Sequence, residues 1–206
     1  VAETRESMTR MTDCIADKVV FDGRRATGVD LVGPAGRRSL VARREVILSA
    51  GAIGSPMILL RSGIGGLEAL RRHAIAVVHD APGVGWNLQD HLIAAIHHST
   101  ESTLPYGISA SKLPWIAWQL LRYVLFRKGI LANTIIHAGG FIRTDPALDR
   151  PDVQFVLLPA GRTPENPHGI GHGYGMVVLL QRPQSRGRVA LSSVDPNAAP
   201  LIDLGY

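Results

Sequence analysis

An amide, a carboxylate and an imidazole lie close together in the sequence at Asn87, Asp90 and His91. A carboxylic acid beside an imidazole is typical of general acid–base catalysis. The same residue types also stabilise loops, because their side-chain oxygens accept hydrogen bonds from nearby backbone N–H groups. Since the turn-forming run Pro82–Gly85 comes just before them, we interpret these residues as holding a loop.

Histidines offer a second kind of chemistry. His168 and His172 are four residues apart, a spacing at which two imidazoles on a helix could bind a metal ion. Pro167 and the glycines around them oppose a helix, so the sequence predicts no metal site. His97 and His98 are neighbours in an expected strand, where their side chains point to opposite faces and cannot act as one pair.

The stretch Arg44–Gly65, REVILSAGAIGSPMILLRSGIG, predicts a strand, a glycine-rich turn and a helix. The apolar and small residues Val46–Ala50 are typical of a strand buried on both faces. Ser55 is a good N-cap residue, and Pro56 suits the first helical position. Gly63 is a natural end for the helix.

Such a strand–turn–helix unit can present backbone N–H groups to a phosphate at the start of the helix. The usual dinucleotide fingerprint GxGxxG is absent from this chain. On the residues alone, a cofactor contact and simple tight packing of the strand on the helix both remain open.

Composition excludes some classes of protein. Of the 22 basic residues in 206, only three are lysines, and the arginines are scattered rather than gathered in a basic stripe. With aromatic residues at 5%, the chain does not resemble a nucleic-acid reader. The longest apolar candidate, Leu113–Phe126, is too short for a membrane span of roughly 20 residues, and we interpret it as a core or surface helix.

The single cysteine, Cys14, excludes an intrachain disulfide. It lies in an apolar stretch, where we expect a buried structural thiol. This fits a reducing compartment, so we expect a cytoplasmic protein.

The pattern of elements predicts an α/β part followed by an α+β part, with the boundary between residues 91 and 92. Before the boundary, short strands at Asp13–Phe21, Ala26–Val32 and Ser39–Ala42 form a meander that leads to Val46–Ser49. After it we expect a mostly antiparallel sheet flanked by the helix Leu113–Phe126. Its strands are Ile93–Ser99, Ile135–Ile142, Val153–Leu158, Met176–Gln181 and Arg188–Leu191.

One stretch carries a specific resemblance. Gly51–Gly65, GAIGSPMILLRSGIG, resembles the second signature of the glucose–methanol–choline (GMC) flavoprotein oxidoreductases. Further stretches resemble other segments of the family, in the same order along the chain: Asp17–Val32, Pro82–Leu92, His137–Thr144 and Ser185–Tyr206.

The resemblance implies bound FAD and oxidation of an alcohol carbon by hydride transfer to flavin N5. It implies that residues 1–91 are part of an FAD-binding domain and that residues 92–206 are most of a substrate-binding domain. It places the dinucleotide-binding unit before Val1 and the catalytic histidine beyond Tyr206. We therefore expect an inactive internal part of a larger enzyme, with no catalytic residue of its own, whose partners are a small alcohol and the rest of that enzyme.

The resemblance also assigns residues. The backbone of Ala16 matches an adenine contact, and Ala50 and Gly51 match a segment beside the adenosine–pyrophosphate half of FAD. Ser49 and Ser55 are weaker candidates for cofactor binding. His137 stands where choline-type members tend to carry glutamate, which favours an uncharged or anionic alcohol over a cationic one.

Two interpretations from other classes stay open. One is a non-catalytic relative in which the substrate sheet is a binding module. The other is a lyase of the same fold that retains FAD without redox turnover. The sequence does not indicate the substrate, the electron acceptor or the oligomeric state.

Overall fold

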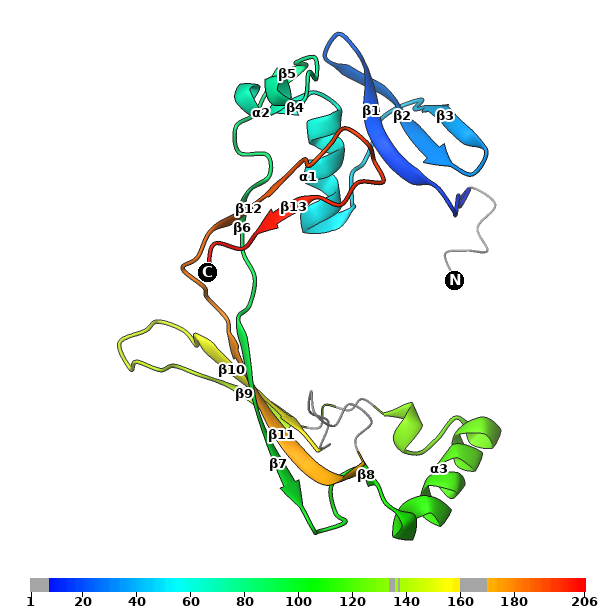
Figure 1. The fold of residues 1–206 in the computed structure, drawn as a ribbon, viewed down its shortest axis with the longest axis vertical. Coiled ribbons are helices and arrows are strands. Elements are labelled where there is room, and N and C mark those ends of the chain that lie inside the picture. Colours follow the sequence, from blue (N-terminus) through cyan, green and yellow to red (C-terminus); the bar gives the residue numbers. More distant parts are fainter. Residues whose placement is uncertain (1–7, 134–135, 137, 160–169) are drawn as a thin grey trace. The chain divides into compact units, whose positions relative to one another are not determined.

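The computed structural model describes residues 8–133, 136, 138–159 and 170–206 (Figure 1). The chain divides into two compact units. Unit 1 comprises Val1–Gln89 with Ser185–Tyr206, and unit 2 comprises Asp90–Gln184. Both are mixtures of helices and mostly antiparallel sheets, as predicted. None of the helices in the described ranges combines the length and the apolar character that crossing a membrane requires.

Unit 1 begins with a three-stranded antiparallel meander, as predicted. Its strands are β1 (Ile15–Asp22), β2 (Arg25–Gly33) and β3 (Gly36–Val41), paired in that order. Gly23 lies in the first turn and Gly36 begins β3 directly after the second, and both have positive φ, a conformation that glycine adopts without steric strain. Cys14, just before β1, is half-buried rather than fully buried.

The helices α1 (Gly51–Arg61) and α2 (Leu67–Arg72) follow the meander. Between and after them run β4 (Ile64–Gly65) and β5 (His79–Asp80), which pair in parallel. Gly63 follows the end of α1 with φ +85°, so the predicted glycine exit from this helix is confirmed. A methyl group on Gly63 would lie 2.3 Å from the backbone oxygen of Ala76, which explains why this position needs glycine.

The last 22 residues of the chain complete unit 1. Strand β12 (Gly187–Ala190) pairs with β13 (Leu201–Asp203) on one side and with β6 (Trp86–Leu88) on the other. Val189 and Leu191 pack into the core formed by Met57, Leu60 and Leu70 of the two helices. The sequence places these final residues with the second domain, but this apolar packing and strand pairing join them to the first unit.

Unit 2 is built on an antiparallel sheet. The strand order is β7 (Ile93–Thr100), β11 (Gly171–Leu180), β10 (Val153–Leu158) and β9 (Ala138–Ile142), and β8 (Gly107–Ile108) pairs with the start of β11. The predicted strand Val153–Leu158 has the bounds of β10. The sequence predicts only the apolar second half of β11, because its first half is rich in glycine.

The helix α3 (Leu113–Phe126) has the bounds that the sequence predicts. The short 3₁₀ turns η2 (Ala110–Lys112) and η3 (Ile130–Ala132) flank it. Arg127 closes α3 in the left-handed conformation, with φ 53°. The predicted stop at Gly129 therefore comes two residues late, although Gly129 also has positive φ.

The predicted buried strand Val46–Ser49 is wrong. These residues form no regular strand, and the side chain of Ile47 is 75% exposed. A strand needs a neighbour that supplies backbone donors and acceptors, and none of the described strands pairs with this segment. Val46 and Leu48 are half-buried, so the segment leads into α1 as an extended connection.

Candidate functional site

The start of α1 has an unusual backbone. Ala50 is the N-cap residue, with φ −87° and ψ 16°, and Gly51 follows with φ +75°. A side chain at Gly51 would be strained in this left-handed conformation. A Cβ built on Gly51 meets no atom of the described residues within 4 Å, so the space beside it is open.

The prediction that Ser55 is the N-cap is wrong, because α1 begins four residues earlier and Pro56 lies inside the helix. Ser55 instead supports the helix start from within, since its Oγ accepts a hydrogen bond from the Ala50 N–H at 3.1 Å. Ser49 is exposed and lies two residues before the helix. Ala50 and Ser55 are therefore brought together by the fold, with Gly51 between them in sequence.

Three backbone donors remain at the start of α1. The N–H groups of Gly51, Ala52 and Ile53 have no carbonyl partner inside a helix at this position, and no side chain of the described residues caps them. All three residues are exposed, and the first turn carries no acidic side chain. The partial positive charge of the helix start is thus unopposed nearby, an arrangement that suits a phosphate or diphosphate group.

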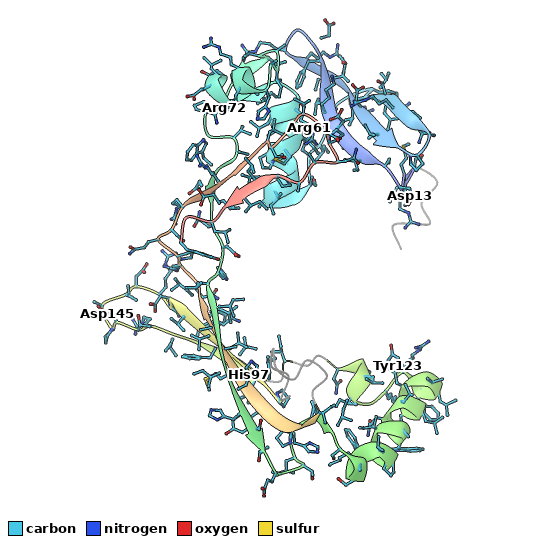
Figure 2. All side chains as sticks on the ribbon, viewed as in Figure 1. Asp13, Arg61, Arg72, His97, Tyr123 and Asp145 are labelled. Atoms are coloured by element: carbon cyan, nitrogen blue, oxygen red, sulfur yellow. The ribbon has the colours of Figure 1, made fainter. Side chains whose placement is uncertain are left out.

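Ala16, the predicted adenine contact, lies near the start of β1 beside a buried ion pair formed by Arg61, which Figure 2 labels, and Asp17. Arg61, the last residue of α1, donates from Nη2 to the Ala16 carbonyl at 3.4 Å. Its Nε lies 3.0 Å from Oδ1 of Asp17, and the two side chains are only 7% and 6% exposed. Arg37 contacts the other carboxylate oxygen at 2.5 Å. Asp17 therefore has two cationic partners, as a buried carboxylate requires.

A cleft of about 670 Å³ lies in unit 1 next to this ion pair. It is lined by β1, the end of α1 and the segment 74–78. None of the five predicted cofactor residues lines it. The candidate cofactor contacts are thus backbone groups at an exposed helix start and a strand edge, not the walls of this cleft.

The histidines show no metal chemistry in the described part of the chain, where no group of three or more potential ligands is found. His172 is occupied by hydrogen-bond partners, with Nε2 at 2.9 Å from Ser109 Oγ and Nδ1 at 3.0 Å from the Pro105 carbonyl. His98 stacks on Tyr174, whereas Nδ1 of His97 is buried without a partner among the described residues. His137 and His168 lie outside the described residues.

The loop interpretation of the first motif is confirmed for Asp90, whose carboxylate accepts a hydrogen bond from the His91 N–H at 3.0 Å. Asn87 has φ 64°, and its side-chain oxygen accepts a hydrogen bond from Gln89 at 3.4 Å. Both contacts are local. Asn87 lies in strand β6 and its contact with Gln89 joins two side chains, so the loop interpretation holds only for Asp90.

Sequence reasoning missed Asp17 and Arg61. A signal was present, because Asp17 interrupts the apolar strand at a position where its neighbour Val19 is buried. Arg61 similarly ends an otherwise apolar helix. A polar residue at a core-facing position indicates a buried partner, but 44 residues separate the two, so the sequence could not indicate which residue that partner is.

The fold has close counterparts among solved structures. A formate oxidase from Aspergillus oryzae RIB40, in a structure concerned with modification of its FAD, matches 94% of this chain with a TM-score of 0.81 and 27% identity. A pyridoxine 4-oxidase from Mesorbium loti matches 98% with a TM-score of 0.76 and 24% identity. The chain covers 39% and 36% of these two proteins. The chain therefore has the fold of the corresponding parts of these two oxidases.

Curated relatives with the names of alcohol-oxidising enzymes match the chain over nearly its whole length. An alcohol dehydrogenase (acceptor) of Pseudomonas putida is 38% identical over 98% of this chain. An oxygen-dependent choline dehydrogenase of Ectopseudomonas mendocina (strain ymp) is 42% identical over all of it. The chain spans 37% of the length of each relative. Residues 2–93 match the model of the GMC oxidoreductase family, and the similarity to these two relatives extends over the rest of the chain.

Proposed function

We propose that this chain is the middle part of an FAD-dependent oxidoreductase that acts on alcohols. The observation that carries the proposal is the start of α1, where three free backbone donors and the open side of Gly51 suit the diphosphate of a dinucleotide. The match of residues 2–93 to the GMC oxidoreductase family supports FAD as that dinucleotide. FAD, when bound, accepts the hydride that leaves the alcohol carbon.

Each predicted cofactor residue has a defined part in this proposal. Gly51 lets the diphosphate approach the backbone without a Cβ in the way. Ser55 holds the Ala50 N–H and so fixes the orientation of the peptide that leads into the helix. Ala16 contributes only backbone groups, so its small side chain is compatible with an adenine contact.

The two parts of the chain have different tasks in the proposal. We assign FAD contacts to residues 1–91, together with Ser185–Tyr206, which pack on α1. We assign the substrate side to the sheet of unit 2. The base that takes the hydroxyl proton, a histidine in the family resemblance, is proposed to lie outside these 206 residues. Relatives that are each more than twice as long support this arrangement.

We assign the choice between cationic and other alcohols to His137. An imidazole next to the substrate does not favour a cationic alcohol in the way that a carboxylate does. In the complete enzyme, His137→Glu is expected to raise kcat/KM for a quaternary-ammonium alcohol relative to an uncharged one. An unchanged ratio of the two values would contradict this assignment.

Anaerobic flavin spectroscopy on the complete enzyme tests the proposed function. We expect an oxidised flavin spectrum that bleaches when an alcohol substrate is added. A bound flavin that no alcohol reduces would instead support the lyase interpretation. A protein that neither contains nor binds flavin would support the binding module, and either result would refute the proposal.

A further inference from the structure

Strand β1 carries a β-bulge at the predicted adenine contact. Ala16 pairs with Leu31 of β2, and the next pair is Lys18 with Asp30, so Asp17 is an extra residue on β1. A bulge interrupts the regular ladder of hydrogen bonds and redirects the backbone. The peptide groups around Asp17 therefore need another structural element to hold them in place.

The end of α1 supplies that support. Nε of Arg61 donates to the Asp17 carbonyl at 2.9 Å as well as to its carboxylate, and Nη2 donates to the Ala16 carbonyl. One guanidinium thus contacts two successive carbonyls of the bulge and the side chain between them. Its planar arrangement of donors makes this possible, and an ammonium group could not reproduce it.

The next residue, Ser62, makes a separate contact with the same strand. Its Oγ accepts a hydrogen bond from the Val19 N–H at 2.8 Å and donates to the Ile58 carbonyl at 2.6 Å. This contact holds β1 two residues beyond the bulge. Arg61 and Ser62 therefore both join α1 to β1, but only Arg61 contacts the peptides next to the predicted adenine contact.

We propose that Arg61 and Asp17 are positioning residues for the adenine half of FAD, an inference that rests on the proposed function. They fix the Ala16 peptide at the bulge so that its backbone is presented in one orientation. The Ala16 carbonyl has two lone pairs, so it can accept a hydrogen bond from an adenine amino group in addition to the one from Arg61. Helix α1 has Arg61 at its end and Gly51 at its start, so it connects the adenine contact to the proposed diphosphate contact.

The test compares two variants of the complete enzyme that both weaken the attachment of α1 to β1. Arg61→Met removes the support of the bulge, and Ser62→Ala removes the contact beyond it. The readouts are the melting temperature of the apoprotein and the dissociation constants of FAD and of ADP, which carries the adenosine half alone. A variant with lower thermal stability but unchanged affinity has lost only structural support.

We expect Arg61→Met to raise the dissociation constants of FAD and ADP by about tenfold, the loss of roughly one well-formed hydrogen bond. Ser62→Ala is expected to lower the melting temperature while leaving both constants within about twofold, because the bulge keeps its support. The same rise in both variants, or no rise with Arg61→Met, would overturn the inference. A rise for FAD without one for ADP would also overturn it, since the loss would not lie on the adenine side.

If Arg61→Met does not fold, Arg61→Lys and Asp17→Asn provide the same comparison of FAD and ADP affinities. Arg61→Lys replaces the planar donors that contact both carbonyls, whereas Asp17→Asn removes the charge that holds the guanidinium beside them. Raised constants for FAD and ADP would support the inference, and unchanged constants would overturn it. A wild-type enzyme that binds FAD but fails to be reduced by alcohols would refute the proposed function while leaving the affinity comparison intact.

Discussion

Helices α1 and α3 differ in what surrounds them, although both are rich in apolar residues. In α1, Met57, Ile58 and Leu60 are buried. In α3 the only buried residue is Gln119, and the side chains of Val124 and Phe126 are each 62% exposed. Gln119 faces its own unit, where its Oε1 accepts a hydrogen bond from the Ile130 N–H at 3.4 Å.

The difference in burial shows that unit 1 fixes α1 in place more firmly than unit 2 fixes α3. Leu113, Leu120 and Val124 recur at helical spacing on one side of α3, and all are more than half exposed. Helix α1 is instead fixed by its core and by polar contacts to β1. A helix fixed by its second half and its end can hold the backbone groups at its start in constant positions, which is what a cofactor contact requires.

Truncation of a buried leucine in α1 should give the largest effect. Leu60 is 4% exposed, so Leu60→Ala is expected to lower the free energy of unfolding of unit 1 by roughly 3 to 5 kcal/mol. Leu125→Ala in α3, which is 60% exposed, is the matched control and should cost less than about 1 kcal/mol. Urea unfolding of this chain measures both values, and similar losses would contradict the contrast between the helices.

Removal of the buried cation Arg61 should give the second largest loss of stability. Arg61→Met leaves Asp17 with only the exposed Arg37 as a partner, and we expect a loss of about 3 kcal/mol. Arg72→Met removes an exposed partner of Glu68 and should cost less than about 0.5 kcal/mol. Denaturant unfolding of both variants provides the measurement. Equal stabilities would mean that α1 is not held at its end by this pair.

Gly51 at the start of α1 and Gly63 just after its end both have positive φ, and their replacement should give an intermediate effect. Gly63→Ala combines left-handed strain with a contact to the Ala76 carbonyl, and we expect a loss of roughly 2 to 3 kcal/mol. Gly51→Ala carries the strain alone, because its surroundings are open, and should cost about 1 kcal/mol. The difference between the two thermal stabilities checks whether the start of α1 is free on that side. A larger loss at Gly51 would show that it is not.

The smallest effect concerns acid stability in unit 2. Hydrogen bonds from the Thr144 side chain, and then from its backbone N–H, lower the pKa of Asp152 below its ordinary 3.8. The ionised carboxylate therefore contributes stability above pH 3.8, and this contribution is lost as the pH falls through the lowered value. Thr144→Val should raise the pKa of Asp152, as carbon-13 NMR of its carboxyl group would report. An unchanged pKa would contradict the assigned cause.

The hydrophobic pattern and the turn-forming residues predict most of the fold from the sequence. They predict α3, β10 and the exit of α1 at Gly63, because each depends on neighbouring residues. They fail for Val46–Ser49, whose apolar character resembles a buried strand although no described strand pairs with it. They also fail for the start of α1, since Ser55 has the chemistry of an N-cap but supports the helix from its second turn.

Contacts between distant residues could not be predicted in the same way. The pairing of Asp17 with Arg61 and the return of Ser185–Tyr206 to unit 1 depend on which segments the fold brings together. For the candidate site, the resemblance supplied Ala16, Ala50 and Gly51, and their roles toward FAD stay predictions. The structure adds the physical feature that unites them, namely one helix with free donors at its start and a buried cation at its end.

The FAD affinity of a Gly51→Val variant of the complete enzyme tests the cofactor contact directly, with Gly36→Val as its matched control. Both glycines have positive φ and open surroundings, so both variants carry similar strain and neither meets a clash within its unit. We expect Gly51→Val to raise the dissociation constant of FAD by at least about tenfold, and Gly36→Val to leave it unchanged. Equal FAD affinities in the two variants would contradict a cofactor contact at the start of α1.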